Sequence, residues 1–277
     1  LSAMSGTTNQ LEAITKELYQ AGHDSAAMKI EELKSKYITV VDKLFESQEY
    51  KEKGNELLTH HFDYLTSFLQ DTFTIYEERA ILAQGELLST SLMYYHLQEK
   101  GINAVLLPAL NFMRIDKSQE PDEYYIRQNI TRELGQHKNS ELFITQGYIC
   151  RNAYGEVDNL KRGGSDYSAS LIGAAVGADE IQIWTDISGF HNNDPRFVKN
   201  TRSLKELSFD EAAELAYFGA KILHPSSVLP AKNAKIPVRL KNTMQPYDEG
   251  TLITETIVQG EIKAVAAKDG ITAIKIK

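Results

Sequence analysis

Residues 162–186 read RGGSDYSASLIGAAVGADEIQIWTD, and this stretch decides the fold. A glycine-rich turn precedes a run of small and apolar residues that predicts a packed helix, which Gly177 can end. The apolar segment 181–185 that follows has the length and composition of a buried strand. Helices that alternate with strands in this way indicate an α/β protein with a largely parallel sheet.

Upstream segments extend the pattern. Residues 104–107 and 142–145 are short apolar strands with a polar helix over 121–134 between them, and residues 148–151 and 156–160 flank a turn and predict a hairpin. Ligands bind beyond the carboxyl ends of parallel strands. We therefore expect the polar residues that follow these strands to face a ligand.

Three further segments complete the organisation. Residues 8–97 have the periodicity of consecutive helices. Ser208-Phe209-Asp210-Glu211 has the form of a capping box and opens another helix, and residues 236–240, which include Pro237, predict an edge-tolerant strand. Residues 1–3 resemble the end of a strand. Residues 262–266 and 271–277 alternate as two strands around an Asp-Gly turn and indicate the start of a small C-terminal domain.

Composition excludes several classes of protein. The chain has 277 residues and a net charge of −8, which argues against a general nucleic-acid binder. Its one cysteine, Cys150, cannot form an internal disulfide, and no apolar run approaches the roughly 18 residues that span a membrane. We expect a cytoplasmic protein without nucleic-acid or membrane partners.

Arg162 to Asp166 form the strongest local signal for a binding site. Arg162 can hold a carboxylate or phosphate with two parallel hydrogen bonds, and backbone amides at a helix N-terminus attract anions. Alternatively, the segment is a loop with Asp166 as the helix cap. Asp186 at a strand end suits a metal–phosphate ligand, although the Asn-Asn-Asp-Pro that follows is also a plain turn. Glu86 follows the mid-helix Gly85, which indicates either helix packing or a ligand nearby.

Taken in order, these motifs resemble the catalytic domain of aspartate kinase, in the amino-acid kinase superfamily. The matching stretches are Leu1-Ser2-Ala3-Met4-Ser5-Gly6-Thr7-Thr8-Asn9, Gln84-Gly85-Glu86-Leu87-Leu88-Ser89-Thr90, Ile144-Thr145-Gln146-Gly147-Tyr148, Arg162-Gly163-Gly164-Ser165-Asp166-Tyr167, Ile183-Trp184-Thr185-Asp186 and Phe218-Gly219-Ala220-Lys221-Ile222-Leu223-His224-Pro225. The resemblance implies a three-layer sandwich around a largely parallel sheet, with a helical insertion near the N-terminus.

It also implies the reaction and the site. ATP with Mg²⁺ would phosphorylate the β-carboxylate of L-aspartate, giving 4-phospho-L-aspartate, the first step of lysine, threonine and methionine biosynthesis. By this resemblance the aspartate side comprises Ser2, Thr8, Glu86, Tyr148, Arg162, Ser165 and Asp166. The nucleotide side comprises Thr185, Asp186, His191, Arg196, Lys221 and Ile222, with Asp166 and Lys221 as catalytic residues and no protein metal ligand assigned.

Three departures from the family pattern bear on activity. The family's Lys-Phe-Gly-Gly-Thr-Ser-Val motif would precede Leu1, so the polypeptide that begins there is expected to be weakly active or inactive. Lys161 stands where glycine is usual, and His191 where tyrosine is common.

Family architecture gives the domain prediction, a catalytic domain over 1–255 and the beginning of an ACT-like regulatory domain over 256–277, with homodimers formed through the ACT domains. Two alternatives stay open. One is a kinase for another carboxylate, such as acetylglutamate or glutamate. The other is a non-catalytic amino-acid-sensing module of the same fold.

Overall fold

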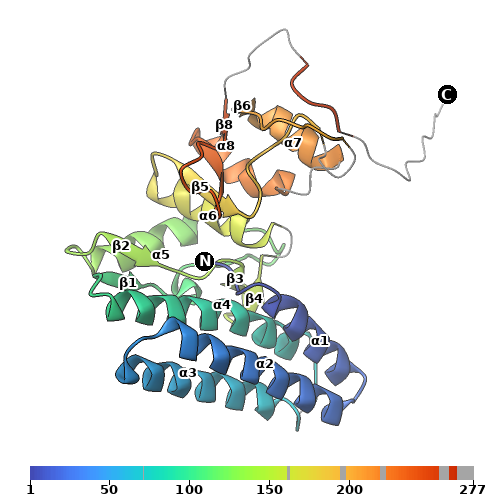
Figure 1. The fold of residues 1–277 in the computed structure, drawn as a ribbon, viewed down its shortest axis with the longest axis vertical. Coiled ribbons are helices and arrows are strands. Elements are labelled where there is room, and N and C mark those ends of the chain that lie inside the picture. The colour runs from blue at the N-terminus through green and yellow to red at the C-terminus, as the bar shows by residue number, and fades with distance from the viewer. Residues whose placement is uncertain (71, 161–162, 194–197, 219–222, 256–261, 267–277) are drawn as a thin grey trace, which may run out of the picture. The chain divides into compact units, whose positions relative to one another are not determined.

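The computed structural model describes residues 1–70, 72–160, 163–193, 198–218, 223–255 and 262–266. The chain divides into two compact units, one over residues 1–161 and the other over 162–277. Figure 1 shows the helices and strands with their labels.

Four helices make up about half of the first unit (Figure 1). They are α1 (Thr7–Tyr19), α2 (His23–Leu44), α3 (Gln48–Ser67) and α4 (Ile75–Glu99). On α2 the buried residues Ile30, Leu33 and Tyr37 recur at helical spacing, as an amphipathic helix requires. The helices pack in sequence, α4 also contacts α1, and their apolar faces meet in one core. The helices predicted over 8–97 are confirmed.

α4 is buried on several sides, because it packs against α1 and α3 and also against β1 and β4. Its buried residues include the apolar Ile81 and Leu88 but also the polar Gln84 and Glu86. A helix enclosed in this way is normally apolar all round. Gln84 and Glu86, like the buried Thr90, are therefore exceptions that call for a partner or a function.

The strands of the first unit are β1 (Ala104–Leu106), β2 (Leu142–Ile144), β3 (Ile149–Arg151) and β4 (Val157–Asn159); η1 (Ala109–Asn111) and α5 (Glu123–Gly135) lie between β1 and β2. β1 and β2 pair in parallel, and β3 and β4 form the predicted hairpin. Beside β2, the amino group of Leu1 donates to Thr145 O (2.7 Å) and Gly147 N donates to Leu1 O (2.8 Å). These bonds bracket Gln146 as in a parallel pair. Residues 1–3 thus begin with strand-like bonds, although no strand is described there.

The second unit contains α6 (Gly164–Val176), β5 (Ile181–Thr185), β6 (Glu206–Ser208), α7 (Phe209–Phe218), η2 (Pro225–Val228), α8 (Leu229–Ala234), β7 (Val238–Asn242) and β8 (Thr251–Thr254). Its sheet has the order β5-β7-β8-β6, with β5–β7 and β6–β8 parallel and β7–β8 antiparallel. The capping box at α7 is confirmed, since Glu211 N donates to Ser208 Oγ (3.2 Å) and Ser208 N to Glu211 Oε2 (2.7 Å).

The strand predicted over 236–240 is present as β7, but its edge character was wrong, and so was the strand predicted over 262–266. β7 lies inside the sheet, between β5 and β8, and not at its edge. Pro237 is tolerated because it precedes the strand, and its carbonyl accepts a hydrogen bond from Ile181 N (2.9 Å). Residues 262–266 form no strand. Residues 271–277 lie outside the described part, so the domain division at 255/256 and the ACT-like start stay predictions.

The α/β class is confirmed, because helices and strands share both units and three strand pairs are parallel. In the described part of the chain, no helix is both long enough and apolar enough to cross a membrane.

Candidate functional site

Glu86 is a buried carboxylate in the middle of α4, with 4% of its surface exposed. Its Oε1 accepts a hydrogen bond from Ala3 N (3.3 Å), whereas its Oε2 has no hydrogen-bond partner among the described residues. Burial raises the pKa of Glu86 to about 7, and the bond from Ala3 opposes this. A buried carboxylate with a spare oxygen is suited to bind a donor group of a ligand.

The chain from Ser2 to Thr8 runs close to Glu86. Ser2 is exposed and its carbonyl accepts from Ser89 Oγ (2.7 Å), while Thr8 is half-buried in the first turn of α1. A Cβ atom on Gly85 would lie 2.8 Å from Ala3 Cβ. The mid-helix glycine therefore allows this segment to pack against α4, as the packing interpretation of Gly85 predicts. The same packing places the segment beside Glu86, the candidate ligand-binding residue.

Tyr148 is the third predicted residue of this region. It lies between β2 and β3 with a φ of 64°, a left-handed conformation that costs a non-glycine residue about 1 kcal/mol. Such backbone strain is often found at functional sites. Burial, followed by the charge of Glu86, raises the pKa of Tyr148 to about 12, so the phenol keeps its proton at neutral pH. The first unit thus brings Ser2, Thr8, Glu86 and Tyr148 into one region.

In the second unit, Ser165 and Asp166 lie half-buried in the first turn of α6. The N-cap residue is Gly163, at a φ of 85°, and no side chain caps the helix, so Asp166 does not serve as its cap. The alternative interpretation of Asp166 is therefore wrong. Burial raises the pKa of its carboxyl group to about 6.

The glycine turn packs against a second predicted motif. A Cβ atom on Gly163 would lie 2.9 Å from Ser227 Cβ and 3.6 Å from His224 Cβ. Ser227 is fully buried in η2, and its Oγ donates to His224 O (2.6 Å). Glycine at 163 thus allows contact between two segments that are about 60 residues apart.

Thr185 and Asp186 lie at the carboxyl end of β5, as predicted. Thr185 Oγ1 accepts from Ile187 N (2.9 Å), and Asp186 is exposed. α6 packs against β5 and joins it through a short turn, so the two run in opposite directions. Since α6 is about 20 Å long and β5 about 17 Å, the first turn of α6 and the end of β5 lie at the same end of this unit.

Polar residues at the end of β7 were missed by the sequence analysis. Asn242 is the register partner of Thr185, and its Nδ2 donates to Ser188 Oγ (2.9 Å), which donates to Gln245 Oε1 (2.9 Å). The available signal was a polar residue at the end of a strand in which apolar and polar residues alternate, at the edge where parallel strands present ligands.

His191 is half-buried, and its Nδ1 lies 3.0 Å from Thr201 Oγ1. Within the described residues, no three His, Cys, Asp or Glu side chains converge on a possible metal position. Arg162, Arg196, Lys221 and Ile222 lie outside the described residues, as does Lys161, and their roles stay predictions.

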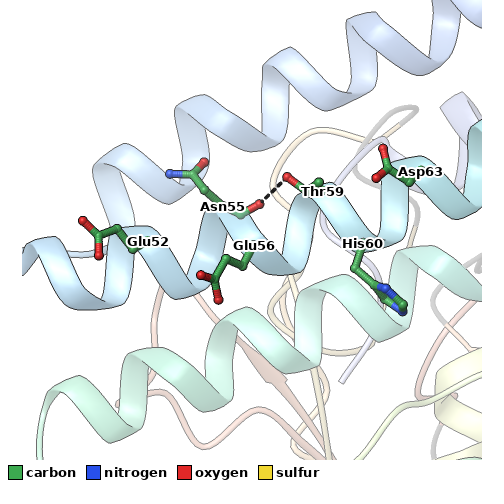
Figure 2. A pocket seen from close by; sticks show the side chains of 6 residues that line it. All are labelled: Glu52, Asn55, Glu56, Thr59, His60 and Asp63. Atoms are coloured by element: carbon green, nitrogen blue, oxygen red, sulfur yellow. Dashed lines mark hydrogen bonds between the residues drawn. The ribbon is translucent and has the colours of Figure 1, made fainter.

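A surface hollow of about 630 Å³ lies elsewhere, along α3 (Figure 2). Figure 2 shows the side chains that line it along one face of the helix: Glu52, Asn55, Glu56, Thr59, His60 and Asp63. None of them is a predicted site residue. Its three carboxylates would repel the phosphates of a nucleotide.

The chain is an α/β protein with parallel strand pairs, a glycine turn before α6 and a buried carboxylate on α4. In α/β proteins of this class, ligands bind beyond the carboxyl ends of the strands. A family model described as "Amino acid kinase family" matches residues 4–242, and the chain belongs to this family. The fold that the resemblance implied is thereby confirmed.

The relatives have more specific names. "Lysine-sensitive aspartokinase 3" of Escherichia coli strain K12 is 32% identical over 267 residues, 91% of this chain and 56% of that protein. "Aspartokinase 1, chloroplastic" of Arabidopsis thaliana is 33% identical over 302 residues, 100% of this chain and 50% of that protein. The crystal structure of E. coli aspartokinase III in complex with aspartate and ADP (R-state) matches with a TM-score of 0.82 at 31% identity, over 94% of this chain and 58% of that one. The resemblance to aspartate kinase is confirmed, and the chain spans about half the length of the curated relatives it matches.

Proposed function

We propose that this chain carries the catalytic domain of an aspartate kinase, which transfers the γ-phosphoryl group of ATP to the β-carboxylate of L-aspartate. The observation that carries the proposal is Glu86, buried on α4 with an oxygen that has no described partner. A solved relative in complex with aspartate and ADP supports the same two ligands. The cytoplasmic location, the homodimer and the biosynthetic role remain part of this proposal.

Glu86 favours an acceptor that carries a free ammonium group. A buried ionised carboxylate is stabilised by an opposite charge within hydrogen-bonding distance. The α-amino group of aspartate supplies that charge, whereas an N-acetylated acid does not. Binding of the ammonium group would in turn lower the pKa of Glu86 and hold it ionised. This argument favours aspartate or glutamate over acetylglutamate.

The acceptor carboxylate needs no strong base, because it is already ionised and nucleophilic at neutral pH. One of its oxygens forms a bond to the γ-phosphorus, and the bond from that phosphorus to the bridging oxygen breaks, so ADP leaves with the electron pair. The protein then contributes to catalysis by aligning the two substrates and by neutralising the charge on the transferred phosphoryl group. We assign aspartate to Ser2, Thr8, Glu86, Tyr148, Arg162, Ser165 and Asp166, and the nucleotide to Thr185, Asp186, His191, Arg196, Lys221 and Ile222.

Mg²⁺, when bound with ATP, would neutralise phosphate charge. Asp186 fits the role of its protein ligand, because it is exposed directly after a parallel strand. Mg²⁺ commonly uses only one or two protein carboxylates and keeps phosphate and water ligands.

The test measures ADP release with L-aspartate, L-glutamate, N-acetyl-L-glutamate and N-acetyl-L-aspartate. We expect turnover with L-aspartate and at least a hundredfold less with N-acetyl-L-aspartate, which differs only at the amino group. Glu86→Gln should raise the Kd of L-aspartate by about tenfold or more, while the exposed control Glu31→Gln should not. Preference for another acceptor, or ADP release that is independent of aspartate, would overturn the proposal.

Two versions of the chain are compared in this assay, one beginning at Leu1 and one preceded by the family's Lys-Phe-Gly-Gly-Thr-Ser-Val segment. We expect turnover mainly in the second. Equal turnover would contradict the expectation that this motif is needed for activity, without affecting the choice of acceptor.

A further inference from the structure

Two consecutive residues of α2, Lys36 and Tyr37, contact the turn that leads into α1. Lys36 Nζ donates to Ser5 O (2.9 Å) and to Gln10 Oε1 (3.2 Å) from the partly exposed side. The hydroxyl of Tyr37 lies 3.1 Å from Thr7 Oγ1 on the buried side. We call Lys36 and Tyr37 the α2 pair. It contacts the turn before α1 and the first turn of the helix, over residues 5–10, from two directions.

The bond between Tyr37 and Thr7 is enclosed in the core. Both residues are 0% exposed, and the ring of Tyr37 packs edge-on against Phe62 with centroids 6.0 Å apart. Burial raises the pKa of Tyr37 to about 12, so the phenol remains a hydrogen-bond donor at neutral pH. A buried hydroxyl that loses its partner is destabilised, so this bond favours one position of Thr7.

Thr7 in turn contacts the region of Glu86. A Cβ atom on Gly85 would lie 3.4 Å from Thr7 Cγ2, so the threonine methyl group packs over the residue that precedes Glu86. Thr7 N also donates a hydrogen bond to Met4 O (2.9 Å), which closes the turn between these residues. The turn follows Ala3, whose backbone amide donates to Glu86 Oε1. The negative charge of Glu86 also contributes to the raised pKa of the Tyr37 phenol.

We propose that the α2 pair, and above all the Tyr37 hydroxyl, positions the acceptor-binding turn of residues 3–8 against Glu86, so that the helical insertion sets the affinity for the amino-acid acceptor. Tyr37 is a positioning residue, which acts through Thr7 and does not touch the ligand. The inference rests on the proposed function for the identity of that ligand. The contact between α2 and the turn does not depend on it.

The test uses Tyr37→Phe, which keeps the ring and removes the hydroxyl. We expect the Kd of L-aspartate, measured by calorimetry, to rise about three- to tenfold, with the kcat of the chain carrying the N-terminal segment changed less than its KM. Thr7→Val should have a similar effect, the double variant should be no worse than either, and Thr7→Ser, which keeps a hydroxyl, should restore most of the affinity. The control is Tyr64→Phe, on α3 and 43% exposed.

Amide hydrogen exchange provides a readout that needs no ligand. Tyr37→Phe should speed exchange over residues 5–10, and Tyr64→Phe should not. An unchanged Kd, additive effects of the two substitutions, or unchanged exchange in folded Tyr37→Phe would each overturn the inference. If the unaltered chain binds no L-aspartate, the proposed function fails, and exchange alone then decides on the positioning by Tyr37.

Discussion

The side-chain amide of Gln146 donates to Thr90 Oγ1 across 2.7 Å, joining the end of β2 to α4. Both residues are buried, and Gln146 Oε1 also accepts from Ala109 N (2.8 Å). Thr90 Oγ1 donates to Glu86 O (2.7 Å), so the network ends on the residue that we assign to the amino group of aspartate.

Thr90→Val should therefore destabilise the chain although it keeps the shape of the side chain. The substitution leaves the amide of Gln146 buried without its acceptor, which costs about 1–3 kcal/mol. Urea unfolding of Thr90→Val would measure this loss. Thr66→Val is the matched control, because Thr66 also bonds a carbonyl within its helix but is exposed, and it should change stability by less than about 0.5 kcal/mol. Equal losses in the two variants would contradict the importance of the network.

A second prediction concerns the ion pair of Arg79 and Asp158. The side chain of Asp158 is 2% exposed and that of Arg79 16%. Arg79→Met leaves a buried carboxylate without its partner and should lower the unfolding free energy by about 3 kcal/mol. Lys53→Met breaks the exposed pair with Glu49 and should cost less than about 1 kcal/mol. A similar, small loss in both variants would show that Asp158 finds another partner or takes up a proton.

Glu86 should make stability depend on pH in a definite direction. Burial raises its pKa in the folded chain from 4.5 to about 7. Between these values the folded state binds more protons than the unfolded state, so the unfolding free energy falls as pH rises, by up to about 3 kcal/mol. Below about pH 4.5 both states are protonated, and above about pH 7 the loss is complete.

Glu86→Gln removes this titration. It should be more stable than the unaltered chain at pH 8 and should show a flatter stability profile between about pH 4.5 and 7. Thermal unfolding of the ligand-free protein across that range measures the effect, with Glu31→Gln as the exposed control. A variant that is less stable at pH 8 would mean that ionised Glu86 has a partner in the folded chain.

Local patterns predicted most of the fold, and long-range contacts account for what was missed. The helices were predicted because apolar residues such as Ile30 and Leu33 recur at helical spacing. β7 was misplaced because the sequence does not show whether Pro237 lies inside or just before the paired residues. The short strands β6 and β8 have too few residues for any pattern.

The candidate site divides in the same way. Gly163 and Asp186 were found by turn and strand-end chemistry, which is local. The contact of Tyr37 with Thr7 joins residues that are 30 positions apart on different helices, and that of Thr90 with Gln146 spans 56 positions. Such pairs depend on how helices pack and are not visible in a single sequence. Motif order predicts which residues share a site, and the fold adds residues that contact some of them.

Gly163 permits a last prediction, in which backbone strain and close packing can be separated. Gly163 and Gly177 flank α6 with φ values of 85° and 68°, so alanine is strained at both by about 1 kcal/mol. At Gly177 nothing lies within 4 Å of an added Cβ, whereas at Gly163 that atom would lie 2.9 Å from Ser227 Cβ. Gly163→Ala should therefore cost at least about 1 kcal/mol more than Gly177→Ala in urea unfolding. The added Cβ of Gly163→Ala overlaps with the Cβ of the buried Ser227. Adding Ser227→Gly should therefore recover the extra unfolding free energy that Gly163→Ala loses, and it should recover none of the loss in Gly177→Ala. Equal losses at the two glycines would mean that η2 moves away from the turn without resistance.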